Sequence, residues 1–384
     1  MLSRTLRLSL ARGDGDRVWR LINSTQLKYM TGIQVIGHGA GDAELNALLN
    51  ARHLTKLKSL RLRGTLLSAD GMTRLLRSPG LDALQCLELG GNNLGPEELQ
   101  ALMNAPLPCT LRVLELSSNK IGDCGVEALV TSPALDGLVR LLLDWNFIGP
   151  AGIASLGHSD FARGLVSLDL SHNPIGDRGA DALASSPVFS NLKELRLAFA
   201  NLSPAGIAKL AMSPHLKALK RLDLLGNEID DEAAIVLAKS PGLAGLASLK
   251  ISRHRLTREG LTALAHSSFL KPGLVAALTR PVAFFREYDG LTQGAVYPIY
   301  QGLNTLGSDE WGGNWRDVDV SGRSYFTLHC EDGVFALTDL NAPGGIRVNG
   351  SMTTMCGLFH GDILEVGEVQ AEFRVIPRCE IQQC

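Results

Sequence analysis

His172, Asp144 and Asp169 are the residues of this chain whose types would suit acid–base chemistry. An imidazole beside carboxylates can take up and return a proton near neutral pH. Catalysis would also need a nucleophile, a glycine-rich phosphate loop or an H-x-x-x-H metal pattern, and none of these accompanies the three residues. We therefore predict no catalytic residue and no enzyme activity.

The cysteines give no sign of a metal centre or of a disulfide framework. Their number is odd and no two of them have C-x-x-C spacing: Cys86, Cys109, Cys124, Cys330, Cys356, Cys379 and Cys384. Zinc sites and disulfide-rich secreted domains show regular cysteine spacings, and this sequence has none. We predict reduced thiols in a cytoplasmic protein that holds no metal and no cofactor.

Composition argues against two classes of partner. The net charge is −2, so no excess of basic residues favours nucleic acid or an acidic membrane surface. No run reaches the roughly 18 uninterrupted apolar residues of a membrane span. Arginines interrupt the apolar residues of the N-terminal segment, which argues against a secretory signal. The expected partners are proteins.

The elements that would position His172 and the two aspartates belong to a sequence repeat with a constant 27-residue period. Leucine stands at each step of a ladder, again three residues later and, with one isoleucine, again five residues later. The ladder positions are Leu57, Leu84, Leu111, Leu138, Leu165, Leu192, Leu219 and Leu246. Met30, Ile33 and Val35 form a degenerate first unit, so residues 30–273 are predicted to hold about nine units.

Each unit has the pattern of one short strand followed by one helix. Leucines two residues apart point to the same side of a strand. The second half of the unit has helical spacing, as in Gly125, Ala128 and Leu129, and a pair such as Ser132-Pro133 then ends the helix. One unit cannot bury its own apolar side, but stacked units can, as a parallel sheet covered by helices.

A polar position after each strand completes the unit, as L-x-x-L-x-L-x-x-N. It is occupied by Asn92, Asn119, Asn146, Asn173 and Asn227, whose amides can satisfy backbone groups of the turn. The pattern fails at Thr65, Ala200 and His254, and Asn201, one residue late, could replace the amide missing at Ala200. Residues 30–273 thus resemble leucine-rich-repeat proteins, and the 27-residue unit resembles the ribonuclease-inhibitor-like subclass.

The resemblance implies an α/β solenoid with a curved parallel sheet inside and helices outside. Residues 1–29, which include Leu6, Leu8, Val18 and Trp19, are expected to cap its N-terminal end as a helix. Some proteins of this family activate GTPases through a loop arginine, but no loop of this sequence is singled out for that role.

The exposed side of the sheet is the predicted binding surface. We call it the strand face; its side chains stand two, four, six and seven residues after each ladder leucine. Three successive units carry Trp145, His172 and Phe199 at the last of these positions. Neighbouring strands lie about 4.8 Å apart, so these rings should lie side by side, and we call them the aromatic row. Glu115, Asp144 and Asp169 are predicted to adjoin it.

Two interpretations of the aromatic row remain open. Apolar anchors with a polar surround are typical of the side chains that dominate protein–protein interfaces. Alternatively, the rings merely cover the turns at the edge of the strands.

From residue 274 onward the pattern changes to short alternating runs with tight turns, typical of an antiparallel β-sandwich. The runs are Val282–Phe285, Ala295–Tyr300, Asp317–Val320, Tyr325–His329, Gly333–Leu337, Gly345–Asn349, Asp362–Val366 and Ala371–Ile376. Together with the repeats, they predict a leucine-rich-repeat solenoid followed by a small all-β sandwich over residues 274–384.

Several short motifs of this region resemble the forkhead-associated domain: Leu306-Gly307, Asp339-Leu340, Val348-Asn349-Gly350, and Gly361-Asp362-Ile363 with Gly367. The resemblance implies phosphothreonine-peptide binding by loops at one end of the sandwich. The sequence departs from the family's phosphate-binding motifs: Ser308 replaces an arginine, Gly322 a serine, Tyr325 a histidine, and Gly344-Gly345 an Asn-Gly pair. Asp309 and Glu310 would also oppose a phosphate dianion.

Five residues of the β-domain loops are candidates for binding. Arg323 and Arg347 could compensate for the missing arginine, and Asn349 belongs to the matching motif. Trp311 and Trp315 flank glycines, which favours an adaptable contact surface, unless the rings pack on the sandwich or on the last repeat.

We therefore predict a non-catalytic scaffold or adaptor, in which the strand face binds one protein and the β domain recruits or orients another. Two alternatives remain: a signalling adaptor that reads phosphothreonine peptides, and a regulator of an enzyme that acts as an inhibitor or as a GTPase activator.

Overall fold

The computed structural model describes most of the repeats and the strands of the C-terminal domain. The described residues are 5–9, 15–36, 42–65, 68, 70–71, 74, 77–78, 81–105, 107–252, 255–272, 274, 281–289, 296–300, 302–308, 315–317, 323–331, 334–339, 342, 344–366 and 369–375. The chain divides into two compact units, Met1–Leu202 with Ser213–Arg221, and Ser203–Met212 with Leu222–Cys384.

The repeats alternate strand and helix, as the sequence predicts. The strands are β1 (Thr5–Ser9), β2 (Gly32–Ile36), β3 (Ser59–Arg63), β4 (Cys86–Glu88), β5 (Val113–Glu115), β6 (Arg140–Leu142), β7 (Ser167–Asp169), β8 (Glu194–Arg196), β9 (Arg221–Leu224) and β10 (Ser248–Ile251). They follow one another in chain order in a parallel sheet. Paired residues are 27 positions apart, for example Leu114 with Leu141 and Leu141 with Leu168.

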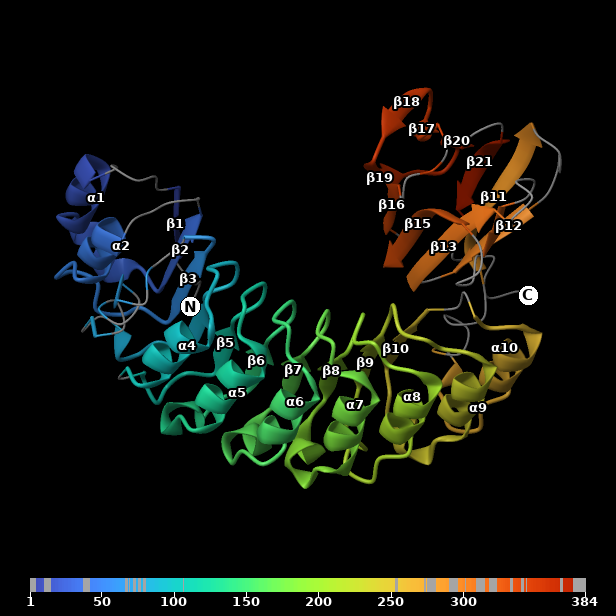
Figure 1. The fold of residues 1–384 in the computed structure, drawn as a ribbon. Helices are drawn as coiled ribbons and strands as arrows, with labels where there is room; N and C mark the ends of the chain where they lie inside the picture. The colour runs from blue at the N-terminus through green and yellow to red at the C-terminus, as the bar shows by residue number, and fades with distance from the viewer. Residues whose placement is uncertain are drawn as a thin grey trace. The chain divides into compact units, whose positions relative to one another are not determined.

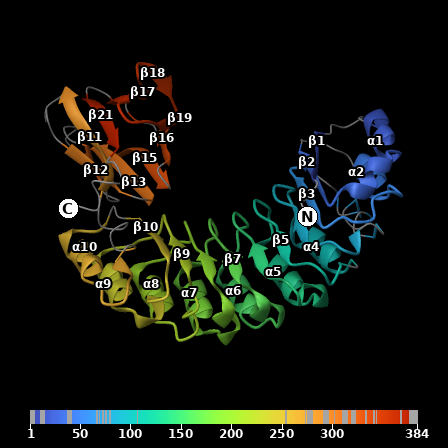
Figure 2. The same cartoon turned by 180° about the vertical axis from the view of Figure 1, so that it is seen from behind.

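The helices are α1 (Gly15–Ile22), α2 (Asp42–Leu49), α4 (Pro96–Met103), α5 (Gly122–Val130), α6 (Pro150–Leu156), α7 (Gly176–Ser185), α8 (Pro204–Ala211), α9 (Asp231–Lys239) and α10 (Arg258–Ala265). Short 3-10 helices lie at Thr25–Tyr29, Pro133–Leu135, Phe161–Gly164, Pro187–Asn191 and Pro241–Leu243. In the first of the two compact parts of the chain, α4 to α7 line one side of strands β4 to β7 (Figures 1 and 2). The opposite side of these strands is therefore the strand face.

The N-terminal segment differs from its prediction. Leu6 and Leu8 do not form a helical cap; they lie in β1, paired in parallel register with Ile33 and Val35 of β2. Each pair is again separated by one full repeat, so the strand ladder extends one unit further toward the N-terminus than the sequence indicated. The predicted helix exists only as α1, where Val18 is buried and Trp19 is exposed.

The core of the repeats comes from the paired leucines of each strand and from the inner side of each helix. Leu141, Leu143, Leu168 and Leu170 have no exposed surface, and neither has Ile153 of α6. Full burial of one such side chain stabilises the fold by about 1.5–3 kcal/mol. The constant repeat length places these side chains in one continuous stack between strands and helices.

The asparagine of each unit is a structural residue. Asn173 is buried; its side-chain oxygen accepts from the backbone N–H groups of Asn146 (2.9 Å) and Ile148 (3.0 Å), and its amide donates to the carbonyls of Leu143 (2.9 Å) and Leu170 (3.0 Å). The amide thereby joins neighbouring units through groups that would otherwise be buried without partners.

Two of the three exceptions to the asparagine pattern lie among the described residues. The Thr65 hydroxyl donates to the Leu62 carbonyl, a partner that an asparagine amide takes in other units. Ala200 is fully buried, whereas Asn201 is exposed with φ +56°, so Asn201 belongs to the turn and does not replace the ladder amide. His254 lies outside the described residues.

From residue 96 onward, the helices of successive repeats begin in two alternating ways. Helices α4, α6 and α8 begin with proline, whereas α5 and α7 begin with a glycine in the left-handed region followed by Asp123 or Asp177. Asp123 caps the helix of the following unit, because it accepts from the Gly149 N–H at 2.6 Å. In the same way, Asp231 of α9 accepts from Thr257 and Gly260.

Glycine is required where these aspartates meet the following helix. A Cβ atom at Gly152 would lie 2.7 Å from an Asp123 oxygen, and one at Gly260 would lie 2.4 Å from an Asp231 oxygen. The aspartate of one unit and the glycine of the next therefore form a matched pair.

The C-terminal domain has two antiparallel sheets that share one core, as expected for a β-sandwich. Its strands are β11 (Pro281–Asp289), β12 (Val296–Tyr300), β13 (Gly302–Ser308), β14 (Trp315–Asp317), β15 (Arg323–Glu331), β16 (Val334–Asp339), β17 (Ile346–Val348), β18 (Ser351–Thr353), β19 (Met355–Leu358), β20 (Ile363–Val366) and β21 (Val369–Val375). The sheet orders are β12-β11-β21-β20-β17-β18 and β14-β13-β15-β16-β19. The sequence did not predict β13, β18 or β19.

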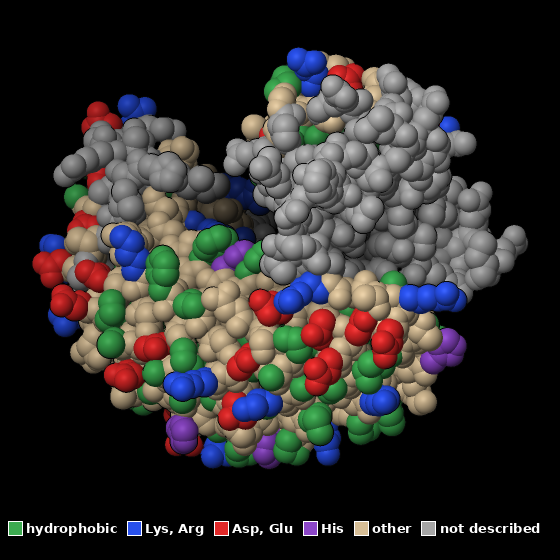
Figure 3. Space-filling model, turned by 45° about the vertical axis from the view of Figure 1, so that its right-hand side comes forward, with side chains coloured by type: hydrophobic (Ala, Val, Ile, Leu, Met, Phe, Trp, Pro, Cys, Tyr) green, Lys and Arg blue, Asp and Glu red, His purple; other side chains and the backbone are tan. Residues whose placement is uncertain are grey.

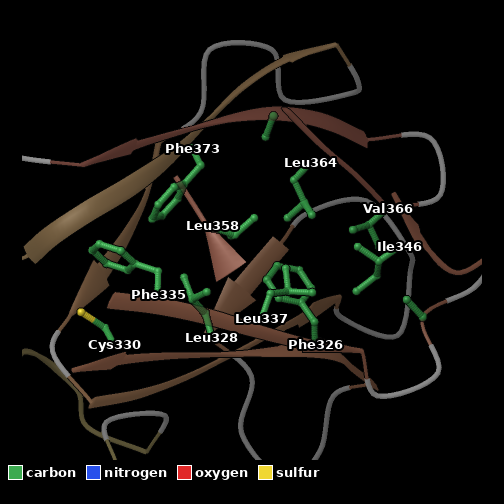
Figure 4. Packing of buried hydrophobic residues seen from close by; sticks show 12 residues of the cluster. Phe326, Leu328, Cys330, Phe335, Leu337, Ile346, Leu358, Leu364, Val366 and Phe373 are labelled. Carbon is green, nitrogen blue, oxygen red and sulfur yellow. The ribbon is translucent and has the colours of Figure 1, made fainter. Parts of the chain in front are cut away.

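Both sheets contribute to the core of this domain (Figure 4). Phe326 and Phe335 come from one sheet and Ile346, Leu364 and Phe373 from the other, and all five are buried. The Phe335 ring meets the Phe373 ring edge-on, with centroids 4.9 Å apart, an arrangement that favours the aromatic quadrupole interaction.

Candidate protein-interaction site

The aromatic row forms a stack of three rings at the ends of neighbouring strands. The Trp145 and His172 ring centroids are 4.0 Å apart with planes inclined by 11°, and those of His172 and Phe199 are 4.6 Å apart and inclined by 14°. The rings therefore lie side by side, as the repeat period indicated. Trp145 is 55% exposed and Phe199 43% exposed. Phe147, two residues after Trp145, extends the exposed apolar surface.

Each residue of the aromatic row has an unusual backbone conformation. Trp145, His172 and Phe199 have φ values of +58°, +56° and +52°. The same position of other units is Gly64, Gly91, Ser118 or Gly226, all with φ between +56° and +68°. A side chain in this left-handed region costs about 1–2 kcal/mol, whereas each ring pair returns about 0.5–1.5 kcal/mol. The turn thus favours glycine, yet three successive units carry aromatic rings.

The predicted acidic surround of the row is mostly buried. Glu115 and Asp169 are 6% and 8% exposed. Each carboxylate accepts a hydrogen bond from the backbone N–H group two residues further along the chain. The Ser117 N–H donates to Glu115 (3.1 Å), and the Ser171 N–H donates to Asp169 (3.0 Å). Burial raises the pKa of Asp169. The half-buried Asp144 accepts a hydrogen bond from the Ser117 hydroxyl. These carboxylates hold the ends of the strands and do not form an exposed acidic rim.

The exposed charges of the strand face near Phe199 are arginines, which sequence reasoning did not single out. Glu194 of β8 lies between Arg196 (Nε to Oε1, 2.9 Å) and Arg221 (Nη2 to Oε2, 2.6 Å). The Glu194 side chain is 9% exposed, whereas those of Arg196 and Arg221 are 51% and 59% exposed. The signal in the sequence was the opposite charge of Glu194 and Arg221, which occupy the same strand position in consecutive repeats.

Opposing effects act on the pKa of Glu194. Burial raises it, but the hydrogen bond from Arg221 and the charge and hydrogen bond of Arg196 lower it more strongly, to about 2. The glutamate is therefore ionised at neutral pH, and with Asp169, 3.6 Å from Arg196, two carboxylates accompany the two arginines.

The candidate residues of the β-domain loops are only partly described. Trp311 lies outside the described residues. Trp315 and Arg323 are backbone positions of β14 and β15 that both pair with Ser308, so they gather at one end of the five-stranded sheet. Arg347 is an exposed residue of β17 in the other sheet.

Asn349 has a structural role that its motif did not reveal. It takes φ +52° in the turn between β17 and β18. Its amide donates to Asp362 (2.8 Å), and its side-chain oxygen accepts from the Ile363 N–H (2.9 Å). Asp362 also accepts from the Phe359 N–H at 2.7 Å. The Asn-Gly and Gly-Asp-Ile motifs therefore bind each other, which links two hairpins.

The described residues were also compared with what a metal site, a membrane-spanning helix or a disulfide would require. Within the described ranges, no three histidine, cysteine, aspartate or glutamate side chains gather as a metal site would require. No helix among the described residues is both long and apolar enough to cross a membrane. The five described cysteines, Cys86, Cys109, Cys124, Cys330 and Cys356, are free thiols.

Comparison with known proteins bears on both parts of the chain. A family model described as Leucine Rich repeat matches residues 108–130, 164–184 and 215–238. An internalin (inlF) from Listeria monocytogenes is similar at 18% identity over 70% of this chain and 86% of that chain, with a TM-score of 0.37. The FHA domain of the CT664 protein from Chlamydia trachomatis is 18% identical over 25% of this chain and 98% of that chain, with a TM-score of 0.21.

An FHA domain studied for phosphothreonine-dependent interactions is 21% identical over 25% of this chain and 97% of that chain, with a TM-score of 0.21. None of the curated proteins matches this chain. The family match and the strand-and-helix repeat identify a leucine-rich-repeat solenoid, which a small all-β domain follows.

Proposed function

We propose that this protein is a non-catalytic interaction scaffold, whose strand face binds a protein partner and whose β domain recruits or orients a second one. The observation that carries the proposal is the aromatic row. Three stacked rings, of which Trp145 and Phe199 are exposed, stand at backbone positions that favour glycine. Folding alone gives little reason for this choice, because the rings bury little surface and the left-handed conformation opposes them.

We also propose that the solenoid is of the ribonuclease-inhibitor-like kind and that the protein works in the cytoplasm. The repeat length, with a helix after each strand, supports the first point. The free thiols of the described cysteines support the second, because reduced cysteines are usual in the cytosol.

The test is affinity capture from a lysate of the source organism with the full-length chain and with the variant Trp145→Gly/Phe199→Gly. Glycine suits both backbone positions, so the variant should keep its fold. We expect proteins captured by the wild type to be absent or strongly reduced with the variant. Met212→Ala is the matched control, because Met212 is 74% exposed but stands at the end of α8. Unchanged capture by the double variant would contradict the proposal.

A second candidate function is recognition of phosphothreonine peptides by the β domain. It is favoured by the gathering of Arg323, Trp315 and Ser308 at one end of a sheet and by exposed Arg347. Titration of the full chain with phosphothreonine peptide libraries tests it, with the dephosphorylated peptides and Arg323→Ala/Arg347→Ala as controls. Affinity that depends on the phosphate and on the arginines would support this function, and the absence of binding would exclude it.

A further inference from the structure

The strand face presents two exposed arginines to a partner beside the aromatic row. Lys/Arg and Asp/Glu side chains are interspersed over the described surface visible in Figure 3. The exposure of the individual charges near the row therefore decides what a partner meets there. Near the row, Asp169 is buried and Asp144 is half-buried and hydrogen-bonded, whereas Arg196 and Arg221 are more than half exposed.

Glu194 fixes the two arginines from behind. Its Oε1 atom lies 2.9 Å from Nε and 2.7 Å from Nη2 of Arg196, and its Oε2 atom lies 2.6 Å from Nη2 of Arg221. The Arg196 Nη1 atom also lies 3.6 Å from Asp169. Each guanidinium has five N–H donors. The glutamate therefore orients both guanidinium groups while their outer sides remain exposed to solvent.

Preorganised arginines are well suited to bind a carboxylate. Holding a long side chain in place before binding removes part of the entropy cost that weak surface ion pairs otherwise incur. Planar guanidinium groups also match the two oxygens of a carboxylate. Arg140 of β6 is a further exposed arginine of the same face.

The arginines and the row lie at a fixed spacing. Arg196 is the last residue of β8, and Phe199 lies three residues later in the turn that follows. A partner that touches both must therefore present an acidic group and an apolar group close to each other.

We propose that Arg196 and Arg221, held by Glu194, form a carboxylate-binding site, and that the partner of the strand face is a protein segment with an acidic side chain close to the aromatic or aliphatic side chain that contacts the row. This inference rests on the proposed scaffold function and specifies the chemistry of its partner. Sequence analysis placed Glu115, Asp144 and Asp169 beside the row and did not single out either arginine.

The test begins with a phage-displayed library of random dodecamer peptides, selected on the full-length chain. We expect the retained peptides to be enriched in Asp or Glu located two to four residues from Trp, Phe, Tyr or Leu. One such peptide is then titrated by fluorescence anisotropy against the wild type and against Glu194→Gln/Arg196→Gln/Arg221→Gln. The triple variant removes Glu194 together with its two arginine partners. Asp169 loses its contact with Arg196 but keeps the hydrogen bond from the Ser171 N–H.

The triple variant should bind the peptide at least ten-fold more weakly than the wild type, and raising the salt concentration should weaken wild-type binding. Replacing the acidic residue of the peptide with its amide should have the same effect on the wild type and no further effect on the triple variant. Retained peptides enriched in Lys or Arg, or equal affinity for wild type and triple variant, would overturn the proposal.

The outcome also separates this inference from the scaffold function on which it rests. Binding lost in Trp145→Gly/Phe199→Gly but unchanged in the triple variant would leave the scaffold function standing and reject the acidic partner. Binding that depends on neither variant, or a library from which nothing is retained, would count against both.

Discussion

The conformation of Trp145 makes the ranking of two substitutions a direct test of how the aromatic row is held. Trp145→Ala and Trp145→Gly both remove the ring and its contact with His172. They differ only in the Cβ atom, which alanine keeps at a φ of +58° and glycine lacks. The difference in stability between the two variants therefore reports the backbone conformation and not the stacking.

The expected magnitude follows from two opposing contributions. A Cβ atom in the left-handed region costs about 1–2 kcal/mol, which only the alanine variant retains. Glycine loses about 0.5–1 kcal/mol more conformational entropy on folding. The glycine variant should thus have the larger free energy of unfolding, by about 0.5–1 kcal/mol.

Urea denaturation followed by far-ultraviolet circular dichroism measures the difference, because this signal does not depend on the tryptophan that is removed. Glu127 provides the control: it is exposed in the interior of α5, where glycine should be about 1 kcal/mol less stable than alanine. The sign of the glycine–alanine difference should therefore reverse between the two positions. A glycine variant at Trp145 that is less stable than the alanine variant would refute the reasoning.

Three other substitutions test the structural roles of polar residues. Asn173→Ala should lower the free energy of unfolding by about 3–5 kcal/mol, because it leaves several buried backbone groups without partners. Asn201→Ala, at an exposed position, should change the free energy of unfolding by less than about 0.5 kcal/mol. Urea titrations measure both changes. Burial raises the pKa of Glu194, but the two arginines lower it more strongly, so that it falls from 4.5 to about 2. The contribution of ionised Glu194 to stability is therefore full above about pH 4.5 and is lost toward about pH 2. The free energies of unfolding of wild type and Glu194→Gln should differ by about 1–2 kcal/mol at pH 6 and converge near pH 2. Asn349→Ala should destabilise the β domain by about 1–3 kcal/mol relative to Arg347→Ala, as measured by amide hydrogen exchange of β17 and β20.

The periodic spacing of the sequence predicts most of the solenoid, because it specifies which residues are neighbours. Parallel pairing of consecutive repeats of constant length places Trp145, His172 and Phe199 side by side without further information. Leu6 and Leu8 obey the same spacing, but their unit lacks the ladder leucine, so their place in β1 was missed.

The spacing does not predict how deeply a side chain is buried. Glu115 and Asp169 occupy strand positions that face outward, yet their carboxylates turn back to accept N–H groups just beyond the end of the strand. Arg196, on the strand next to Asp169, has a longer side chain that is more exposed, so a partner meets its guanidinium group before the carboxylate. Strands β18 and β19 were missed because three or four residues are too few to show alternation.

The alternation of helix starts also limits how this solenoid can grow or shrink. Asp123 fits a following unit that begins with Gly149 and Pro150, and Asp231 fits one that begins with Thr257. Loss of the single unit between Asp123 and Asp177 would bring two aspartates together and remove the helix start that Asp123 caps. From Asp123 onward, gene duplication, recombination or protein engineering that preserves these contacts must therefore add or remove repeats in pairs, so that the heritable module of this part of the array is twice the length of its visible repeat.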